Sequence, residues 1–179
     1  PVMIVGEGSL GGGMAEPVLA FAEATGIPVF TTTIALGALP GGHPQNGGGV
    51  QSLPLIGAKP DLVILAGTRQ GMFSGGCSGA FVPPDAKVIQ LDPDGAEIGR
   101  LYPVSVGLVG DVGNGLSALA RRRNWPDRTA WCTQARSARN FPDKMFAAAG
   151  MEDDGIHPHR VAKEVFQQTP DGEIMVFDG

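Results

Sequence analysis

A glycine-rich segment close to the start of the chain has the spacing of a nucleotide-binding loop. Residues 6–11 read G-x-G-x-x-G and follow an apolar run at residues 2–5. Glycines at this spacing let the backbone approach a pyrophosphate, and the first N–H groups of a following helix can hold its charge. Gly6, Gly8 and Gly11 are therefore candidate nucleotide contacts.

The segment departs from the NAD-binding pattern in one respect that decides against it. A dinucleotide site of that type carries an Asp or Glu about 20 residues further on, at the end of the second strand. Here the second apolar run leads into residues 31–33, which are all threonine, and Gly12 and Gly13 lengthen the glycine loop. We therefore expect no dehydrogenase-type NAD site. A structural glycine turn, or a site for a differently held nucleotide, stays open.

Polar side chains follow each of the other apolar runs. Thr32 follows the second run, Thr68 and Arg69 the third, Asp92 the fourth and Asp111 the fifth. An arginine can hold a phosphate with two parallel hydrogen bonds. Each residue could equally serve a turn or cap a helix, as Asp111 would. With the glycines they form a predicted nucleotide crevice: Gly6, Gly8, Gly11, Thr32, Thr68, Arg69, Asp92 and Asp111.

The chain has no residue pattern of a catalytic or metal centre. It contains no G-x-S-x-G motif, His43 lies in a Gly/Pro-rich loop, and His157 and His159 flank a proline ahead of a helix. Cys77 and Cys132 are far apart, with no C-x-x-C. We expect no catalytic residue and no metal ligand here. Two unpaired thiols predict a reducing, cytoplasmic location, with a disulfide between them left open.

The elements that would position these residues alternate between strands and helices. Apolar runs at residues 2–5, 29–31, 62–66, 88–91 and 106–109 predict buried strands, most without apolar/polar alternation, as in a parallel sheet covered on both faces. Helices are expected at residues 14–25, 50–58, 112–123, 129–140 and 158–168. This order predicts an α/β fold with an open, doubly wound, mainly parallel Rossmann-like sheet. The candidate residues would then share one edge of the sheet.

The domain organisation predicted from the sequence has three parts. Residues 1–149 form a Rossmann-like domain, the polar, aperiodic residues 150–157 a linker, and residues 158–179 the first helix and strand of a further domain. The chain begins directly before a strand and stops directly after one. That pattern predicts a piece of a longer protein.

Composition excludes two classes of partner. The 179 residues carry a net charge of −5, and the basic run at residues 121–123 closes a helix, where cations suit the dipole. No electrostatic footprint for nucleic acid is present. No apolar segment approaches the roughly 20 residues that a membrane span requires. We therefore expect neither nucleic acid nor a membrane as a partner.

Several segments, taken in order, resemble the central domain of thiamine-diphosphate-dependent enzymes. They are residues 27–30, 59–64, 87–94, 97–100 and 109–111. The superfamily is that of acetolactate synthase and benzoylformate decarboxylase. Residues 125–128, with Trp131, Cys132, His157 and Pro158, look like the connection into the C-terminal domain of benzaldehyde lyase. The closest resemblance is therefore to benzaldehyde lyase.

The resemblance implies a three-domain lyase or carboligase acting on aldehydes, 2-hydroxyketones or 2-oxo acids. Thiamine diphosphate and Mg²⁺ would be held mainly by flanking pyrimidine- and pyrophosphate-binding domains, while this non-catalytic domain spaces them. Asp178 and Gly179 would lie at the edge of the thiamine site. The intact protein would be a homodimer or homotetramer.

Some relatives bind FAD or ADP in the central crevice. After Arg69 this chain reads Gln-Gly-Met-Phe, in place of the Arg-Phe-Asp-Asp-Arg run of flavin-binding synthases. The mismatch argues against flavin. The alternative function is a free-standing FAD- or ADP-binding module that uses the predicted crevice.

Overall fold

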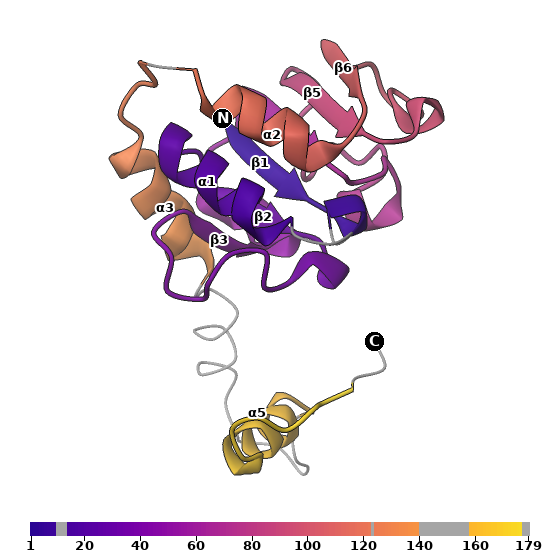
Figure 1. The fold of residues 1–179 in the computed structure, drawn as a ribbon. Helices are drawn as coiled ribbons and strands as arrows, with labels where there is room; N and C mark the ends of the chain where they lie inside the picture. Colours follow the sequence, from indigo (N-terminus) through magenta and orange to yellow (C-terminus); the bar gives the residue numbers. More distant parts are fainter. Residues whose placement is uncertain (10–13, 123, 140–157, 177–179) are drawn as a thin grey trace. The chain divides into compact units, whose positions relative to one another are not determined.

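The computed structural model describes residues 1–9, 14–122, 124–139 and 158–176. The chain divides into two compact units, Pro1–Phe141 and Pro142–Gly179. The first unit is built around a six-stranded sheet, and the second contains the helix α5 (Pro158–Gln168). Figure 1 shows the elements of each unit.

All neighbouring strands of the sheet run parallel. The strands are β1 (Val2–Val5), β2 (Val29–Thr31), β3 (Asn46–Gly49), β4 (Leu62–Ala66), β5 (Lys87–Asp92) and β6 (Val106–Val109). Their order across the sheet is β3-β2-β1-β4-β5-β6, so the order reverses between β1 and β4. The predicted doubly wound parallel fold is confirmed. The reversal point is also where open sheets of this kind bind ligands, beyond the carboxyl ends of the strands.

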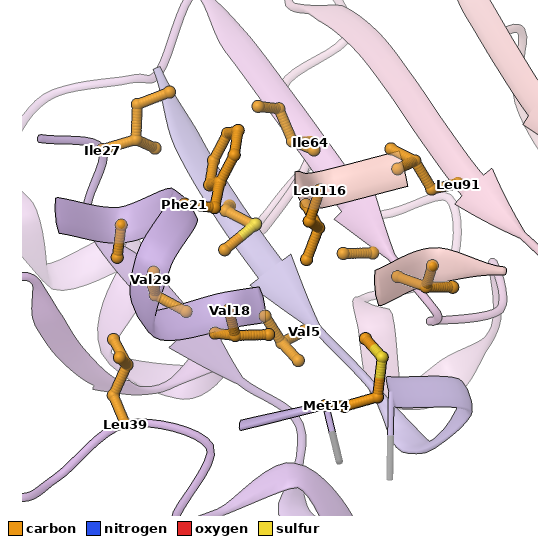
Figure 2. Close-up of a cluster of buried hydrophobic side chains, with 14 of the residues drawn as sticks. Val5, Met14, Val18, Phe21, Ile27, Val29, Leu39, Ile64, Leu91 and Leu116 are labelled. Atoms are coloured by element: carbon orange, nitrogen blue, oxygen red, sulfur yellow. The ribbon is translucent and has the colours of Figure 1, made fainter. Parts of the chain in front are cut away.

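Alternate residues of the central strands point to opposite faces of the sheet and belong to two separate hydrophobic cores. On one face Met3, Val5 and Ile64 pack with α1 (Ala15–Thr25) and α2 (Val112–Ala120), as Figure 2 shows for Phe21 and Leu116. On the other face the strands pack against the 3-10 helix η3 (Val50–Ile56) and α3 (Thr129–Arg139). Burial of both faces explains why β1 and β4 read as continuous apolar runs.

Two helix ends show common capping chemistry, and Asp111 has the cap role that the sequence left open. Gly26 ends α1 with φ 63°, and its N–H bonds to the Ala22 carbonyl at 2.8 Å. Asp111 begins α2, because its Oδ1 accepts from the Asn114 N–H at 2.7 Å. The helix expected at residues 50–58 is instead η3, a 3-10 helix that contains Pro54. A proline has no N–H to donate inside an α-helix.

Two further elements differ from the sequence expectation. The strand β3 reads Asn-Gly-Gly-Gly and was not predicted, because glycine is rare in strands. Glycine is needed at position 47 because a Cβ there would lie 2.5 Å from the Phe30 ring. A strand was expected at residues 173–177, but none forms over the described residues 173–176, where Ile174 and Val176 are exposed. A strand needs a hydrogen-bonded neighbour, and the described residues offer it none.

Candidate functional site

The loops that follow the strands meet at the carboxyl edge of the sheet. Backbone N–H groups just past the strand ends donate to carbonyls of the neighbouring strands: Gly6 to Ala66 (3.1 Å), Thr32 to Val5 (2.9 Å), Gly67 to Leu91 (2.9 Å) and Gly110 to Asp92 (3.0 Å). These bonds prolong the ladders by one residue. The structure therefore places the described members of the predicted crevice along one edge.

The glycine loop is packed against the loop that follows β4. The N–H of Gly8 donates to the Gly67 carbonyl at 2.8 Å. A Cβ on Gly6 would lie 2.4 Å from Thr68 Cβ, and one on Gly8 would lie 2.9 Å from the Gly67 oxygen. Both positions therefore require glycine for a close approach within the protein itself. Gly11 lies outside the described residues.

The cation of the predicted crevice is paired with an acid from the same crevice. Arg69 Nη2 forms an ion pair with Glu7 Oε1, although the two residues are 62 positions apart in the sequence. Glu7 occupies the first variable position of the G-x-G-x-x-G segment and begins the short 3-10 helix η1 (Glu7–Ser9). The ion pair joins the loop after β1 to the loop after β4.

The two aspartates of the crevice serve the backbone. Asp92 is buried at the end of β5, and its Oδ1 accepts from the Asp94 N–H at 2.9 Å. Asp111 caps α2, as described above. The side chains of Thr32 and Thr68 are also buried. The turn and cap roles that the sequence left open are thus the ones observed for Asp92 and Asp111.

A buried glutamine pair beside this edge was not found from the sequence. Gln70 Oε1 accepts from the N–H groups of Leu101 (2.6 Å) and Tyr102 (3.0 Å), and Gln70 Nε2 donates to Gln90 Oε1 at 3.2 Å. Gln90 Nε2 in turn donates to the Glu97 carbonyl at 2.9 Å. Both glutamines are fully buried. The pair holds residues 97–102 beside β4 and β5. Its one signal in the sequence was Gln90, a lone polar residue inside the apolar run at 88–91.

Two cavities lie away from the carboxyl edge. One, of about 260 Å³, lies at the C-terminal end of α1 beside Trp125 and Arg128. The other, of about 450 Å³, lies between residues 76–88 and 101–105 and is lined by Cys77, Tyr102 and several prolines and valines. Neither is lined by a residue of the predicted crevice.

The histidines and cysteines form no cluster in the part of the chain that is described. His43 Nε2 lies 3.6 Å from Glu23 Oε1, so the imidazole has a carboxylate neighbour. Cys77 and Cys132 are both free thiols, and the disulfide left open by the sequence does not form. Burial raises the pKa of the Cys132 thiol. Within the described ranges no three His, Cys, Asp or Glu side chains gather as a metal site.

Tyr102 gives a direct optical test of the packing around the larger cavity. Burial raises its pKa from 10.0 to about 12, the nearby Cys77 adds to the rise, and the Ser74 hydroxyl opposes it. The chain has one tyrosine, so phenolate absorbance reports this residue alone. We expect a titration midpoint near 12 in the folded chain and near 10 in denaturant. Because the unfolded chain releases this proton first, stability should fall between about pH 10 and 12. A folded-state midpoint near 10 would contradict the burial of this phenol.

The fold and the arrangement of the carboxyl edge define a class of protein. The chain is a doubly wound α/β domain whose glycine loop lies at the reversal point of a parallel sheet. Residues 1–119 match the family model described as "Thiamine pyrophosphate enzyme, central domain". The chain belongs to this family, and the resemblance predicted at the family level is confirmed.

Relatives with assigned activities include acetolactate synthases. The chain is 41% identical over 124 residues to the acetolactate synthase large subunit of Corynebacterium glutamicum, an alignment covering 66% of this chain and 20% of that protein. It is 29% identical over 177 residues to a Methanocaldococcus jannaschii protein assigned as the same subunit, covering 93% of this chain and 29% of that one. The chain thus spans between a fifth and a third of the length of these relatives.

A solved structure supports the same family. It is an X-ray structure of a protein from Mycobacterium smegmatis assigned as a thiamin diphosphate-dependent enzyme. The TM-score is 0.57 and the identity 26%, over 71% of this chain and 25% of that one. The family implies thiamine diphosphate as the cofactor of its enzymes. Asp178 and Gly179, predicted at the edge of that site, lie outside the described residues.

Two further expectations concern the resemblance to benzaldehyde lyase and the absence of a membrane span. The relatives reported above are acetolactate synthases, so the closer resemblance to benzaldehyde lyase stays a prediction. None of the helices within the described residues is long and apolar enough to cross a bilayer.

Proposed function

We propose that the chain is the central domain, followed by the start of the next domain, of a thiamine-diphosphate- and Mg²⁺-dependent lyase or carboligase. The observation that carries the proposal is the family match over residues 1–119, which coincides with the six-stranded sheet. The proposed division is residues 1–149, a linker at 150–157 and the start of the next domain at residues 158–179. The 177-residue alignment supports a part of the chain beyond the sheet domain. The linker lies outside the described residues.

In this proposal the domain has a structural role: it positions the domains on either side of it. Four side chains at the carboxyl edge are engaged within the domain: Arg69 pairs with Glu7, and Asp92 and Asp111 accept hydrogen bonds from the backbone. Such an edge can hold its loops in place for neighbouring domains. When bound, thiamine diphosphate supplies the electron sink for cleaving or forming a bond next to a carbonyl carbon. Its ligands would come mainly from flanking domains.

The sheet also offers a surface for those partners. Val106, Leu108 and Val109 are exposed on β6, which is the last strand of the sheet. An exposed apolar edge strand invites association unless something covers it. This surface supports the proposal that flanking domains, or a second subunit of a homodimer or homotetramer, pack here. We also propose a cytoplasmic location, because free thiols are typical of a reducing compartment and both cysteines are free.

Two observations favour different classes of substrate. The acetolactate synthase relatives favour a 2-oxo acid, whereas the residues resembling benzaldehyde lyase favour aldehydes or 2-hydroxyketones. Neither of the two cavities described above is lined by the crevice residues at the carboxyl edge, so neither indicates a substrate there. We therefore propose the broader class, a carboligase or lyase acting on one of these three substrate types.

The experiment compares the 179-residue chain with the product of the gene that contains it. Each is incubated with thiamine diphosphate and Mg²⁺, and with pyruvate, benzaldehyde or benzoin. We expect acetolactate, benzoin or benzaldehyde, respectively, from the longer protein with at least one substrate, and no product from the chain alone. Product formation by the chain alone would overturn its supporting role. A longer protein inactive on all three substrates would overturn the proposed carboligase or lyase activity.

A further inference from the structure

The carboxyl edge contains a positive charge where a phosphate group would need one, but that charge is already matched. The Arg69 guanidinium lies beside the glycine loop and is paired with Glu7 of that loop. The side chains are 59% and 43% exposed, so a dissolved anion can reach the pair. A diphosphate that approaches Arg69 would therefore find the guanidinium already paired with the Glu7 carboxylate.

Two backbone donors in the described part of the glycine loop are also engaged within the protein. In a nucleotide-binding loop, N–H groups point at the phosphates and the glycines leave room for them. Here the N–H groups of Gly6 and Gly8 donate to the carbonyls of Ala66 and Gly67, at 3.1 and 2.8 Å. The space beside both glycines is filled by Gly67 and Thr68. At Gly6 and Gly8, the N–H groups and the space beside the glycines are therefore taken up by the loop after β4 and not left for a phosphate.

We propose that Glu7 is a specificity residue that holds Arg69 and closes this edge to ligands that carry a diphosphate. A carboxylate satisfies a guanidinium with the same charge-assisted hydrogen bonding that a phosphate oxygen would use. Glu7 also places a negative charge beside any bound phosphate, and like charges repel. The proposal concerns nucleotide exclusion and does not depend on the carboligase activity of a longer protein.

The side chain at position 7 should therefore decide whether the edge can bind ADP. Replacing Glu7 by glutamine keeps the shape of the side chain but removes its charge, so Arg69 can pair with an incoming phosphate. We expect the association constant for ADP to rise at least about tenfold in E7Q, which corresponds to about 1.4 kcal/mol. The gain should disappear in the double variant E7Q/R69Q, because the phosphate partner is then missing.

The test is calorimetric titration of the full 179-residue chain with ADP, without Mg²⁺ or thiamine diphosphate and at low ionic strength. E16Q is the matched control, since Glu16 is an exposed acid in the first turn of α1 with the same charge. Adenosine is titrated as a second probe to separate base binding from diphosphate binding. Circular dichroism confirms that each variant is folded.

The results expected are weak or undetectable ADP binding by the unmodified chain and by E16Q, with a gain in E7Q for ADP only. The proposal is overturned if the unmodified chain binds ADP with micromolar affinity, which would favour the nucleotide-binding module. It is equally overturned if E7Q shows no gain, if E16Q gains as much, or if the gain survives removal of Arg69. None of these outcomes bears on whether the longer protein is a carboligase.

Discussion

Replacing Gln70 by leucine is expected to lower the free energy of unfolding by about 2–4 kcal/mol. The leucine would leave the N–H groups of Leu101 and Tyr102 without the Gln70 oxygen that accepts from both. A buried donor left without a partner costs about 1–3 kcal/mol, and the segment around Leu101 is partly exposed, which reduces the sum. Urea denaturation measures the change directly, as a lower midpoint with an unchanged slope.

The matched control for this substitution is Gln51→Leu, because Gln51 is exposed on the same unit. It should change stability by no more than about 0.5 kcal/mol. The double variant Q70L/Q90L tests whether the two glutamines act as one unit, since contacting residues in one network are not additive. Equal midpoints for Gln70→Leu and Gln51→Leu would show that the network does not hold residues 97–102.

Strands β1, β2, β4 and β5 were predictable because they are buried and their sequences are mostly apolar. The strand at residues 106–109 was also expected to be buried, but all four residues of β6 are exposed, because β6 is an edge strand and has a neighbour on one side only. Runs such as residues 62–66 are apolar at every position, as a strand covered on both faces must be. The caps at Gly26 and Asp111 were predictable for a similar reason, since each depends on one residue and its near neighbours. Local chemistry therefore defined most of the sheet and the ends of α1 and α2.

The strand β3 could not be predicted from local chemistry. Asn46–Gly49 has the composition of a turn, and it forms a strand by pairing with β2, where the ring of Phe30 lies against Gly47. The ring fills the space that a Cβ on Gly47 would occupy, so the glycine is required by a contact between β2 and β3. A single sequence carries no signal for such a contact.

The candidate site was predictable in its location but not in its internal contacts. The spacing of the glycines and the positions of Arg69 and Asp92 after their strands placed them at one edge. Glu7, in contrast, stood at a variable position of the motif, and its pairing with Arg69 spans 62 residues. The pairing of Gln70 with Gln90 likewise needed the parallel alignment of β4 with β5. Long-range polar contacts of this kind depend on the assembled sheet.

Replacing Leu116 by alanine is expected to lower the free energy of unfolding by about 3–5 kcal/mol. Leu116 lies on α2 and is fully buried in the core that also contains Phe21, Ile64 and Leu91 (Figure 2). Truncation removes apolar contacts with α1 and with the sheet and leaves a cavity that neighbouring side chains fill only partly. A loss of this size is a large part of the roughly 5–15 kcal/mol that stabilises a typical domain.

The matched control is Leu36→Ala, since Leu36 is 62% exposed whereas Leu116 is 0% exposed. The same atoms are removed in both variants, so the difference between them isolates the contribution of packing between α1, α2 and the sheet. Leu36→Ala should cost no more than about 0.5 kcal/mol. Thermal unfolding followed by circular dichroism should show a lower midpoint for Leu116→Ala, by roughly 2–4 °C for each kcal/mol lost. Asp111, which caps α2, follows β6 at the carboxyl edge. If both variants lose a similar amount of stability, the packing of α2 against the core does not stabilise this edge.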